Sequence, residues 1–403
     1  MTDWESFHRA HGIRPLINVS GTMTALGASI AVPEARQAVA EVLPQFVPIH
    51  AAQELASRAI ARATGAEAGF ITASASAGIT LAVAGAMTGL DPARVEQLPD
   101  ARGMKDEVVI QAGHMCNYGA PVEQAIRLAG ARVVPVGQST QAQDHQLAGA
   151  LGERTAAAVF VVSHHVVDYG QIPLAPFVRL CRERGVPVIV DAAAEQDLTG
   201  FIGAGADIAI YSAHKFLGGP TAGIVCGRRD LVRAAYLQNM GIGRGMKVGK
   251  EGIFGAIAAL ESWQRRDHAA ARAREGAALD LWQTAVAGIP GVQARLAPDP
   301  TGNPVDRLRL DIDAARLGAS ARAVAAALAA GDPAIIVRDH EVEQGWFQLD
   351  PCNLHDGQAP IVAERLRATL EAAARGALPE PDGDAWRNAS VAAYLAWGEG
   401  AMP

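Results

Sequence analysis

The 403-residue sequence contains few charged residues, few aromatic residues and only four cysteines. Charged residues make up 19% of the chain and the formal net charge is −7, so the basic surplus with which nucleic-acid-binding proteins neutralise phosphates is missing. The cysteines are far apart and form no CxxC pair, which argues against a disulfide framework or a zinc ribbon, and no metal site is predicted. We therefore expect a cytoplasmic protein whose main partner is not nucleic acid.

A long hydrophobic run is also missing. The longest apolar stretch, residues 79–90, is interrupted by threonine and glycine and falls short of the roughly 18 residues that a membrane span needs. The N-terminus lacks the basic segment and the apolar segment of a signal peptide. We therefore expect no membrane helix, while the 50% of hydrophobic residues allow a chain of this length to bury a large core.

Short apolar runs alternate with alanine-rich helical stretches between about residues 64 and 227. This alternation predicts an α/β fold with a mostly parallel central sheet. Crossover helices are expected at 121–129 and 176–184, because each stretch begins with proline and has helical periodicity. The expected strands, mostly rich in β-branched residues, are 107–111, 131–136, 157–163, 186–191, 208–212 and 223–226.

The rest of the chain indicates a second, smaller α+β domain. Residues 253–286 contain no proline and have a helical apolar period, so they predict one or two long connecting helices. Strands at 307–312 and 334–338 then flank a helix at 320–330 that begins with serine. The predicted division is an N-terminal arm at 1–45, a large domain at 46–250, connecting helices at 251–290 and a small C-terminal domain at 291–403.

The most informative stretch places Lys215 between two apolar strands, within the sequence Ser212-Ala-His-Lys215 and before a Gly/Pro-rich loop. A desolvated lysine has a lowered amine pKa, which suits Schiff-base chemistry with a carbonyl; the alternative is an exposed loop lysine. Asp191 ends the preceding apolar strand. A carboxylate there can keep a pyridine nitrogen protonated, as a pyridoxal phosphate cofactor requires, or can simply cap the next helix.

Two further segments follow strands. Residues 69–78 join a short strand to an apolar helix through Ser74, Ala75 and Ser76. Such a segment is typical either of a phosphate site at a helix N-terminus or of a tight turn with a serine cap. His114 comes just past the strand at 107–111, where an imidazole can lie flat on a cofactor ring or can be merely structural.

Together, the small-residue loop, the strand-end His114 and Asp191, and the S-x-H-K motif resemble the fold-type-I pyridoxal 5′-phosphate enzymes of the aminotransferase class V and selenocysteine synthase-like groups. The resemblance covers most of the chain. The segments that are also similar to the subgroup of D-glucosaminate-6-phosphate ammonia-lyases are 17–27, 114–130, 243–250 and 349–354.

The resemblance implies a role for each matched residue. Lys215 is the lysine that forms the Schiff base with the cofactor and later moves the Cα proton. Asp191 pairs with the pyridinium nitrogen, and His114 stacks on the ring. The other implied cofactor contacts are Ser74, Ala75, Ser76, Ser212 and His214 at the phosphate, and Ala193 under the ring.

One position departs from the pattern of related enzymes such as the cysteine desulfurases, which carry asparagine before the cofactor on the strand that precedes the aspartate strand. This chain has His164 and His165 there. His165 or its neighbour faces the phenolic oxygen of the cofactor, or both are satisfied loop histidines; the sequence leaves these two interpretations open.

Cationic side chains are candidates for the substrate's anionic groups. Arg338 is chosen for the α-carboxylate because its fork can bind that group with two hydrogen bonds, although Arg307 and Arg309 lie on another strand of the same domain. Arg244 and Lys247, with Lys250 close by, are expected to bind a distal substrate phosphate or, across a dimer interface, the cofactor phosphate. The alternative is a solvated basic loop.

The expected activity is that of a pyridoxal 5′-phosphate-dependent lyase. It would carry out an α,β-elimination, the dehydrative deamination of a hydroxyamino acid or amino sugar acid, phosphorylated or not, to a 2-keto acid and ammonia. Racemisation, aldol cleavage and β-replacement at sulfur or selenium are alternative outcomes, and a non-enzymatic binding protein of the same fold is a further alternative. A homodimer or higher homo-oligomer is expected, because active sites in this fold class are generally built at a dimer interface.

Overall fold

The computed structural model describes residues 3–398, and their contacts separate two compact units. The larger unit contains Thr24–Arg266 together with the short segment Pro300–Asn303. The smaller unit contains residues 3–23, Asp267–Asp299 and residues 304–398. Residues 1, 2 and 399–403, which the predicted arm and small domain include, lie outside the described residues.

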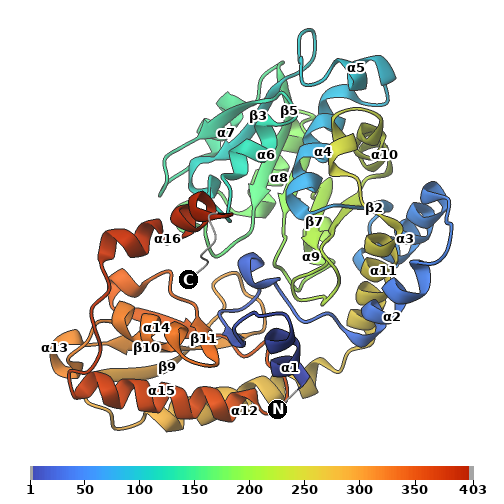
Figure 1. The fold of residues 1–403 in the computed structure, drawn as a ribbon. Coiled ribbons are helices and arrows are strands. Elements are labelled where there is room, and N and C mark those ends of the chain that lie inside the picture. The colour runs from blue at the N-terminus through green and yellow to red at the C-terminus, as the bar shows by residue number, and fades with distance from the viewer. Residues whose placement is uncertain (1–2, 399–403) are drawn as a thin grey trace. The chain divides into compact units, whose positions relative to one another are not determined.

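A seven-stranded sheet with the order β2-β8-β7-β6-β5-β3-β4 forms the centre of the larger unit (Figure 1). In this sheet β8 runs antiparallel to both of its neighbours, and the remaining pairs are parallel. The α/β fold with a mostly parallel sheet is therefore confirmed. The strands are β2 (Ala68–Thr72), β3 (Glu107–Gln111), β4 (Arg132–Val136), β5 (Thr155–Val161), β6 (Val188–Asp191), β7 (Ile208–Ser212) and β8 (Gly223–Gly227).

Both faces of this sheet are buried under helices. Val108 and Ile110 belong to one hydrophobic cluster and Val109, between them, belongs to another, as the alternation of side chains along a strand requires. On one face, α4 and α10 pack against each other (Figure 1). The helices of the larger unit are α2 (Pro33–Val42), α3 (Ile49–Thr64), α4 (Ala75–Thr88), α5 (Pro92–Gln97), α6 (Val122–Arg127), α7 (Asp144–Ala150), α8 (Leu174–Glu183), α9 (Gly200–Gly203), α10 (Arg229–Leu237) and α11 (Lys250–Arg265).

The strand directions decide where the following loops lie. Because β2, β3, β5, β6 and β7 all run the same way, their carboxyl ends meet at one edge of the sheet. Ligands of open α/β sheets bind at that edge.

The smaller unit combines a three-stranded antiparallel sheet, β12-β10-β9, with a parallel pair formed by β1 and β11. Its buried core contains Trp282 and Phe347 among many aliphatic side chains. Its strands are β1 (Leu16–Val19), β9 (Val292–Pro298), β10 (Asp306–Ile312), β11 (Ala334–Val337) and β12 (Trp346–Leu349). Its helices are α1 (Asp3–Ala10), α12 (His268–Val286), α13 (Ala314–Leu317), α14 (Ala321–Ala330), α15 (Gln358–Ala374) and α16 (Gly383–Ala396).

This grouping differs from the predicted domain division in two places. The predicted arm at 1–45 is divided, because its described residues up to Met23 belong to the smaller unit and those from Thr24 to the larger one. In the smaller unit β1 pairs in parallel with β11, with Leu16 opposite Ala334. The two connecting helices also separate, since α11 packs on α2 and α3 of the larger unit whereas α12 packs on α15 of the smaller one. Within residues 3–398, no helix combines the length and the apolar character needed to cross a bilayer.

Candidate active site

The common edge of the larger sheet collects most of the predicted site residues. Ser74 follows β2, His114 follows β3, His165 follows β5, Asp191 ends β6 and Lys215 follows β7. The last two strands are neighbours, and Ser212 N donates a hydrogen bond to Ala193 O at 3.1 Å, which joins the loops that carry Asp191 and Lys215.

The predicted phosphate loop begins a 14-residue helix, α4. Ser74 Oγ caps this helix by accepting a hydrogen bond from Ala77 N at 3.0 Å. The first amides of a helix have no acceptor inside it and carry the positive end of the helix dipole, so they suit an anion. β8 passes so close to the loop that a Cβ on Gly223 would lie 2.2 Å from Ser74 O, which explains the glycine there. Ser76 Oγ is 3.0 Å from Tyr118 Oη.

The buried imidazole of His214 adds an unsatisfied group. Within residues 3–398, His214 Nδ1 has no hydrogen-bond partner. Burial and then the neighbouring Lys215 charge lower the pKa of His214, so the ring is neutral at neutral pH. A buried nitrogen that lacks a partner carries a free-energy cost, and a ligand that bonds to it removes that cost. Ser29 Oγ fixes the loop by donating to His214 O at 2.7 Å.

The proton affinities of Asp191 and Lys215 are shifted toward each other. Burial raises the pKa of Asp191 to about 6, against the opposing effects of the Lys215 charge and of a 3.2 Å hydrogen bond from Ala193 N. Burial also lowers the pKa of the Lys215 amine, while the charge of Asp191 acts in the opposite direction. Such a pair in one place is a common mark of an active site. Lys215 is half-buried, as a lysine that reaches a ligand should be.

The His114 ring is enclosed by the protein, with only 2% of the residue exposed. Its Nδ1 accepts a hydrogen bond from Val161 N at 3.2 Å, and its edge meets the Phe160 ring with 4.5 Å between centroids. Burial lowers the pKa of His114 to about 4, although the Asp168 charge opposes this, so the ring is neutral and carries its proton on Nε2. Stacking of His114 on a cofactor stays a prediction.

The two histidines after β5 lie close together. The rings of His164 and His165 have centroids 3.8 Å apart, and His165 N donates to Ser163 Oγ at 3.2 Å. Both residues are half-buried in the loop that follows the β5 strand. They therefore reach the same sheet edge as Asp191, one strand away.

Three residues that the sequence analysis did not select belong to the same region. Cys116 is buried, and burial, with the charge of Asp191 next, raises the pKa of its thiol to about 11. Tyr118 lies beside Ser76, and Glu195 is a buried carboxylate whose charge also acts on Lys215. The sequence could have indicated two of them by their closeness to selected residues, because Cys116 is two residues after His114 and Glu195 is four residues after Asp191.

The three arginines considered for the substrate carboxylate differ in their bonded partners within the smaller unit. Arg307 is buried and pairs with Asp299 and Asp350, each at 2.8 Å. Arg309 donates to Asp311 at 2.8 Å and its guanidinium lies 3.8 Å from the centroid of the Trp346 ring.

Arg338 differs from both of these arginines. The residue is 8% exposed, yet within residues 3–398 no ion pair or hydrogen bond joins its guanidinium to another residue. Burial lowers the pKa of Arg338, and the Arg307 charge lowers it further. A buried cation without a bonded anion is costly, so Arg338 is the arginine that would gain most from a bound carboxylate.

The basic segment before α11 is only partly available for ligands. Lys250 Nζ donates to the backbone carbonyls of Leu43 and Gln45, so it holds the loop between α2 and α3. Arg244 and Lys247 are exposed. Met246 O, between them, accepts a hydrogen bond from Thr72 Oγ1 at 3.3 Å, which ties this segment to the end of β2 near the phosphate loop.

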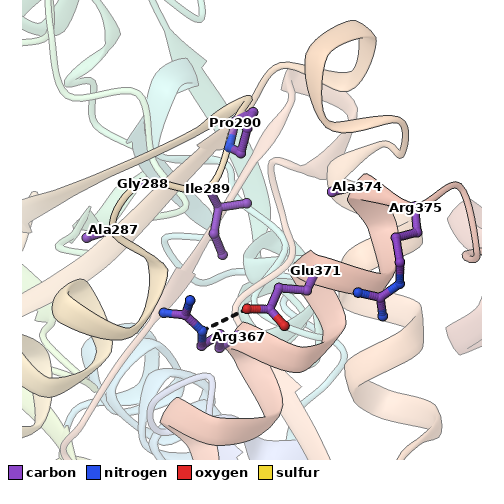
Figure 2. A pocket seen from close by; sticks show the side chains of 8 residues that line it. All are labelled: Ala287, Gly288, Ile289, Pro290, Arg367, Glu371, Ala374 and Arg375. Carbon is purple, nitrogen blue, oxygen red and sulfur yellow. Dashed lines mark hydrogen bonds and ion pairs between the residues drawn. The ribbon is translucent and has the colours of Figure 1, made fainter.

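A surface pocket of about 330 Å³ lies elsewhere, in the smaller unit (Figure 2). It is lined by residues 287–290 and by α15, where Arg367 Nε donates to Glu371 Oε1 at 2.8 Å (Figure 2). None of the predicted site residues lines it, and an arginine already paired with a glutamate offers no acid–base chemistry. We assign this pocket no catalytic role.

The sheet order, the helix-start loop, the strand-end aspartate and the strand-end lysine together define a fold-type-I pyridoxal 5′-phosphate enzyme. The residues present fit this cofactor: His214 Nδ1 and the start of α4 suit its phosphate, the carboxyl of Asp191 suits its ring nitrogen and Lys215 suits its aldehyde. Within that class, the chain belongs to the SelA family, described as L-seryl-tRNA selenium transferase, whose sequence profile matches residues 16–297.

Two curated relatives and one solved structure cover most of the chain. A D-glucosaminate-6-phosphate ammonia lyase of Salmonella typhimurium (strain 14028s / SGSC 2262) is 42% identical over 90% of this chain and 97% of its own length. A 5′-C-glycyluridine monooxygenase-decarboxylase of a Streptomyces species is 37% identical over 89% of this chain and 90% of its own. A solved D-glucosaminate-6-phosphate ammonia-lyase superposes with a TM-score of 0.82 at 41% identity, covering 91% of this chain and 99% of that one. The protein is thus an enzyme of the pyridoxal phosphate lyase type.

The burial of Asp191 predicts a pH-dependent stability difference. The pKa of Asp191 is about 6 in the folded protein and 3.8 when unperturbed, so the unfolded chain loses this proton first as the pH rises. The wild-type protein without cofactor should therefore lose stability between about pH 4 and pH 6, and Asp191→Asn should not. Above pH 6 the variant should be more stable by on the order of 2–3 kcal/mol.

Urea unfolding of both proteins without cofactor, repeated from pH 3 to pH 8, measures this difference. Asp280→Asn, an exposed aspartate on α12, is the matched control and should change little at any pH. Equal stabilities of the wild-type and Asp191→Asn proteins across the whole range would show that Asp191 is hydrated, contrary to the structure.

Proposed function

We propose that the protein catalyses the dehydrative deamination of a hydroxyamino acid or amino sugar acid, giving a 2-keto acid and ammonia. The observation that carries this proposal is the placement of buried Asp191 and half-buried Lys215 at adjacent strand ends, at the sheet edge that also carries a helix start suited to a phosphate. The choice of elimination among the reactions of this class rests on the 42% identity to an ammonia lyase over nearly the whole length of both chains.

The residues of this chain divide the work around the cofactor. Pyridoxal phosphate, when bound, supplies a conjugated ring that accepts the electrons left at Cα when its proton is removed. Lys215 would bind the aldehyde of this group, and its Nζ, once free, would take the Cα proton of the substrate. Asp191 would keep the ring nitrogen protonated, and Ala193 is assigned to the ring. Ser74, Ala75, Ser76, Ser212 and His214 would hold the phosphate.

A second proton is needed when the β-hydroxyl leaves as water. The enclosed His114 ring, with a pKa of about 4, is a weak candidate for this role and suits stacking on the ring better. His164 and His165 are half-buried in the loop after β5, so we assign them the hydroxyl or the phenolic oxygen of the cofactor. Water then hydrolyses the released enamine to the keto acid and ammonia, so the water lost and the water consumed balance.

The substrate is held by its anionic groups. Arg338 is assigned to the α-carboxylate because its guanidinium, unlike those of Arg307 and Arg309, is not neutralised by a bonded carboxylate. Arg244 and Lys247 are assigned to a distal phosphate, or to the cofactor phosphate of a second copy in a homodimer. A net charge of −7 favours such a small molecule over a tRNA. The four free cysteines suit a reducing cytoplasm.

A substrate panel tests the proposed reaction directly. Cofactor-loaded protein should convert D-glucosaminate 6-phosphate, or another hydroxylated amino acid in a panel of D- and L-isomers, to equal amounts of keto acid and ammonia. Racemised substrate without ammonia would contradict elimination. Carbon dioxide formed with consumption of dioxygen would instead place the reaction beside that of the monooxygenase-decarboxylase relative.

Arg338→Met should weaken substrate capture. Loss of a charge-assisted pair costs about 1.5–3 kcal/mol, so kcat/KM should fall roughly 10–150-fold, mostly through KM. Steady-state kinetics of Arg338→Met and of Arg309→Met measure this effect. Arg309 is already bonded to Asp311, so its variant should stay near the wild type. A larger loss in Arg309→Met than in Arg338→Met would reverse the assignment.

A further inference from the structure

Gln111, the last residue of β3, is a fully buried polar residue that the proposed function does not use. Its Oε1 accepts a hydrogen bond from Ile172 N at 2.7 Å, and its Nε2 donates to Ile172 O at 3.1 Å. These two bonds determine which end of the amide is the oxygen, because a flipped amide would place donor against donor and acceptor against acceptor. The NH2 end of the side chain therefore has one position.

The backbone around this amide is closely packed. Ile172 belongs to residues 162–173, the segment that joins β5 to α8. Val167 N, in the middle of that segment, donates to Gly113 O at 2.9 Å. A Cβ on Gly113 would lie only 2.7 Å from Val167 O, so the segment lies directly against the residues that follow β3. Gln111 is thus held in a region that leaves its side chain no room to turn.

The fixed NH2 group lies beside the His114 ring, 3.5 Å from Nε2, while Val161 N donates to Nδ1 of the same ring at 3.2 Å. Within residues 3–398, both ring nitrogens therefore have a donor as their neighbour. A neutral imidazole has one acceptor nitrogen, which the Val161 bond uses, and its other nitrogen carries the proton. An imidazolium ion has two N–H donors and no acceptor, so it would lose the Val161 bond and would face a donor at each nitrogen.

Burial and one carboxylate also act on the charge of this ring. The charge of Asp168, in the segment after β5, favours the protonated form, but burial outweighs it and lowers the pKa of His114 to about 4. The edge of the ring meets the apolar Phe160 ring. The two donors act in the same direction as burial, and among these groups only Asp168 favours protonation.

We propose that Gln111 is a positioning residue that acts through His114, and that its fixed amide keeps this ring neutral and in one orientation. The proposal deepens the proposed function and rests on it, since His114 is the ring assigned to stack on the cofactor. The ring nitrogen of that cofactor is assigned a proton, and a positively charged imidazole against it would repel this charge. A ring that does not gain a second proton cannot act as a general acid, so another group supplies the proton for the leaving hydroxyl.

Nuclear magnetic resonance of the full chain without cofactor tests this role without any activity measurement. With nitrogen-15-labelled histidine, proton–nitrogen correlation spectra distinguish the two neutral tautomers from the imidazolium. The His114→Asn protein identifies which of the 11 histidine signals belongs to this ring. The wild-type ring should be neutral at pH 6 and above, with its proton on Nε2. A ring that is charged at pH 6, or that carries its proton on Nδ1, would overturn the proposal.

Two variants test the contribution of the amide itself. Gln111→Glu keeps the size of the side chain and replaces the donor beside Nε2 by a carboxylate, which accepts from an imidazolium and attracts its charge. The pKa of His114 should then rise by about 1–3 pH units. Gln111→Met suits a buried position if the glutamate variant does not fold; it removes the donor without adding charge and should raise the pKa by less. An unchanged pKa of His114 in these variants would overturn the role of Gln111.

The matched control is Gln124→Glu, which makes the same change on an exposed residue of α6 and should leave the His114 signals unchanged. An equal rise in that variant would contradict the proposal. In the cofactor-loaded protein, the visible absorption band of Gln111→Glu should change over the same pH range as the ring, because a positive charge then forms beside the cofactor. A band that ignores the charge of the ring would overturn the effect of His114 on the cofactor.

The two sets of spectra separate this proposal from the proposed function. If the protein bound no pyridoxal phosphate, the proposed function would fail. The spectra without cofactor would still decide whether Gln111 keeps His114 neutral.

Discussion

The mutual electrostatic effect of Asp191 and Lys215 is the interaction on which the proposed chemistry depends. Burial raises the pKa of Asp191 and lowers that of Lys215, and the charge of each group opposes the effect of burial on the other. The larger unit achieves the arrangement by placing β6 and β7 side by side in parallel, so that both residues leave the sheet at the same edge. Burial of these two groups lowers the stability of the folded protein, but it gives a base and a carboxylate with proton affinities that suit catalysis.

The remaining features of the larger unit keep this pair away from water and supply the groups around it. Helices cover both faces of the sheet, and glycine at position 223 lets β8 pass against the start of α4. The phosphate loop follows β2 and the enclosed His114 ring follows β3 to the same edge, while the unsatisfied His214 nitrogen lies beside Lys215 after β7. In the smaller unit, Arg338 is likewise a buried ion without a bonded partner within residues 3–398. Both units therefore contain ionised groups whose cost a ligand can relieve.

The sequence predicted the parts of the structure that depend on local patterns. Strand-ending residues such as Asp191 and the S-x-H-K motif could be placed because an apolar run is followed at once by a polar group. The contact between Thr301 and Glu195 could not, since it joins residues 106 positions apart and no pattern links them. The pairing of β1 with β11, which draws the N-terminus into the smaller unit, escaped for the same reason. Arg338 was chosen from the sequence, but the physical reason to prefer it to Arg307 and Arg309 came from the carboxylates that the latter two bind in the structure.

Borohydride reduction of the purified, cofactor-loaded protein, followed by peptide mapping, tests the central claim most directly. The account predicts a visible absorption band that reduction abolishes, with the pyridoxyl label on Lys215 and on none of the three other lysines. A label on Lys105, Lys247 or Lys250, or a protein that stays colourless after incubation with pyridoxal phosphate, would contradict the assignment of Lys215.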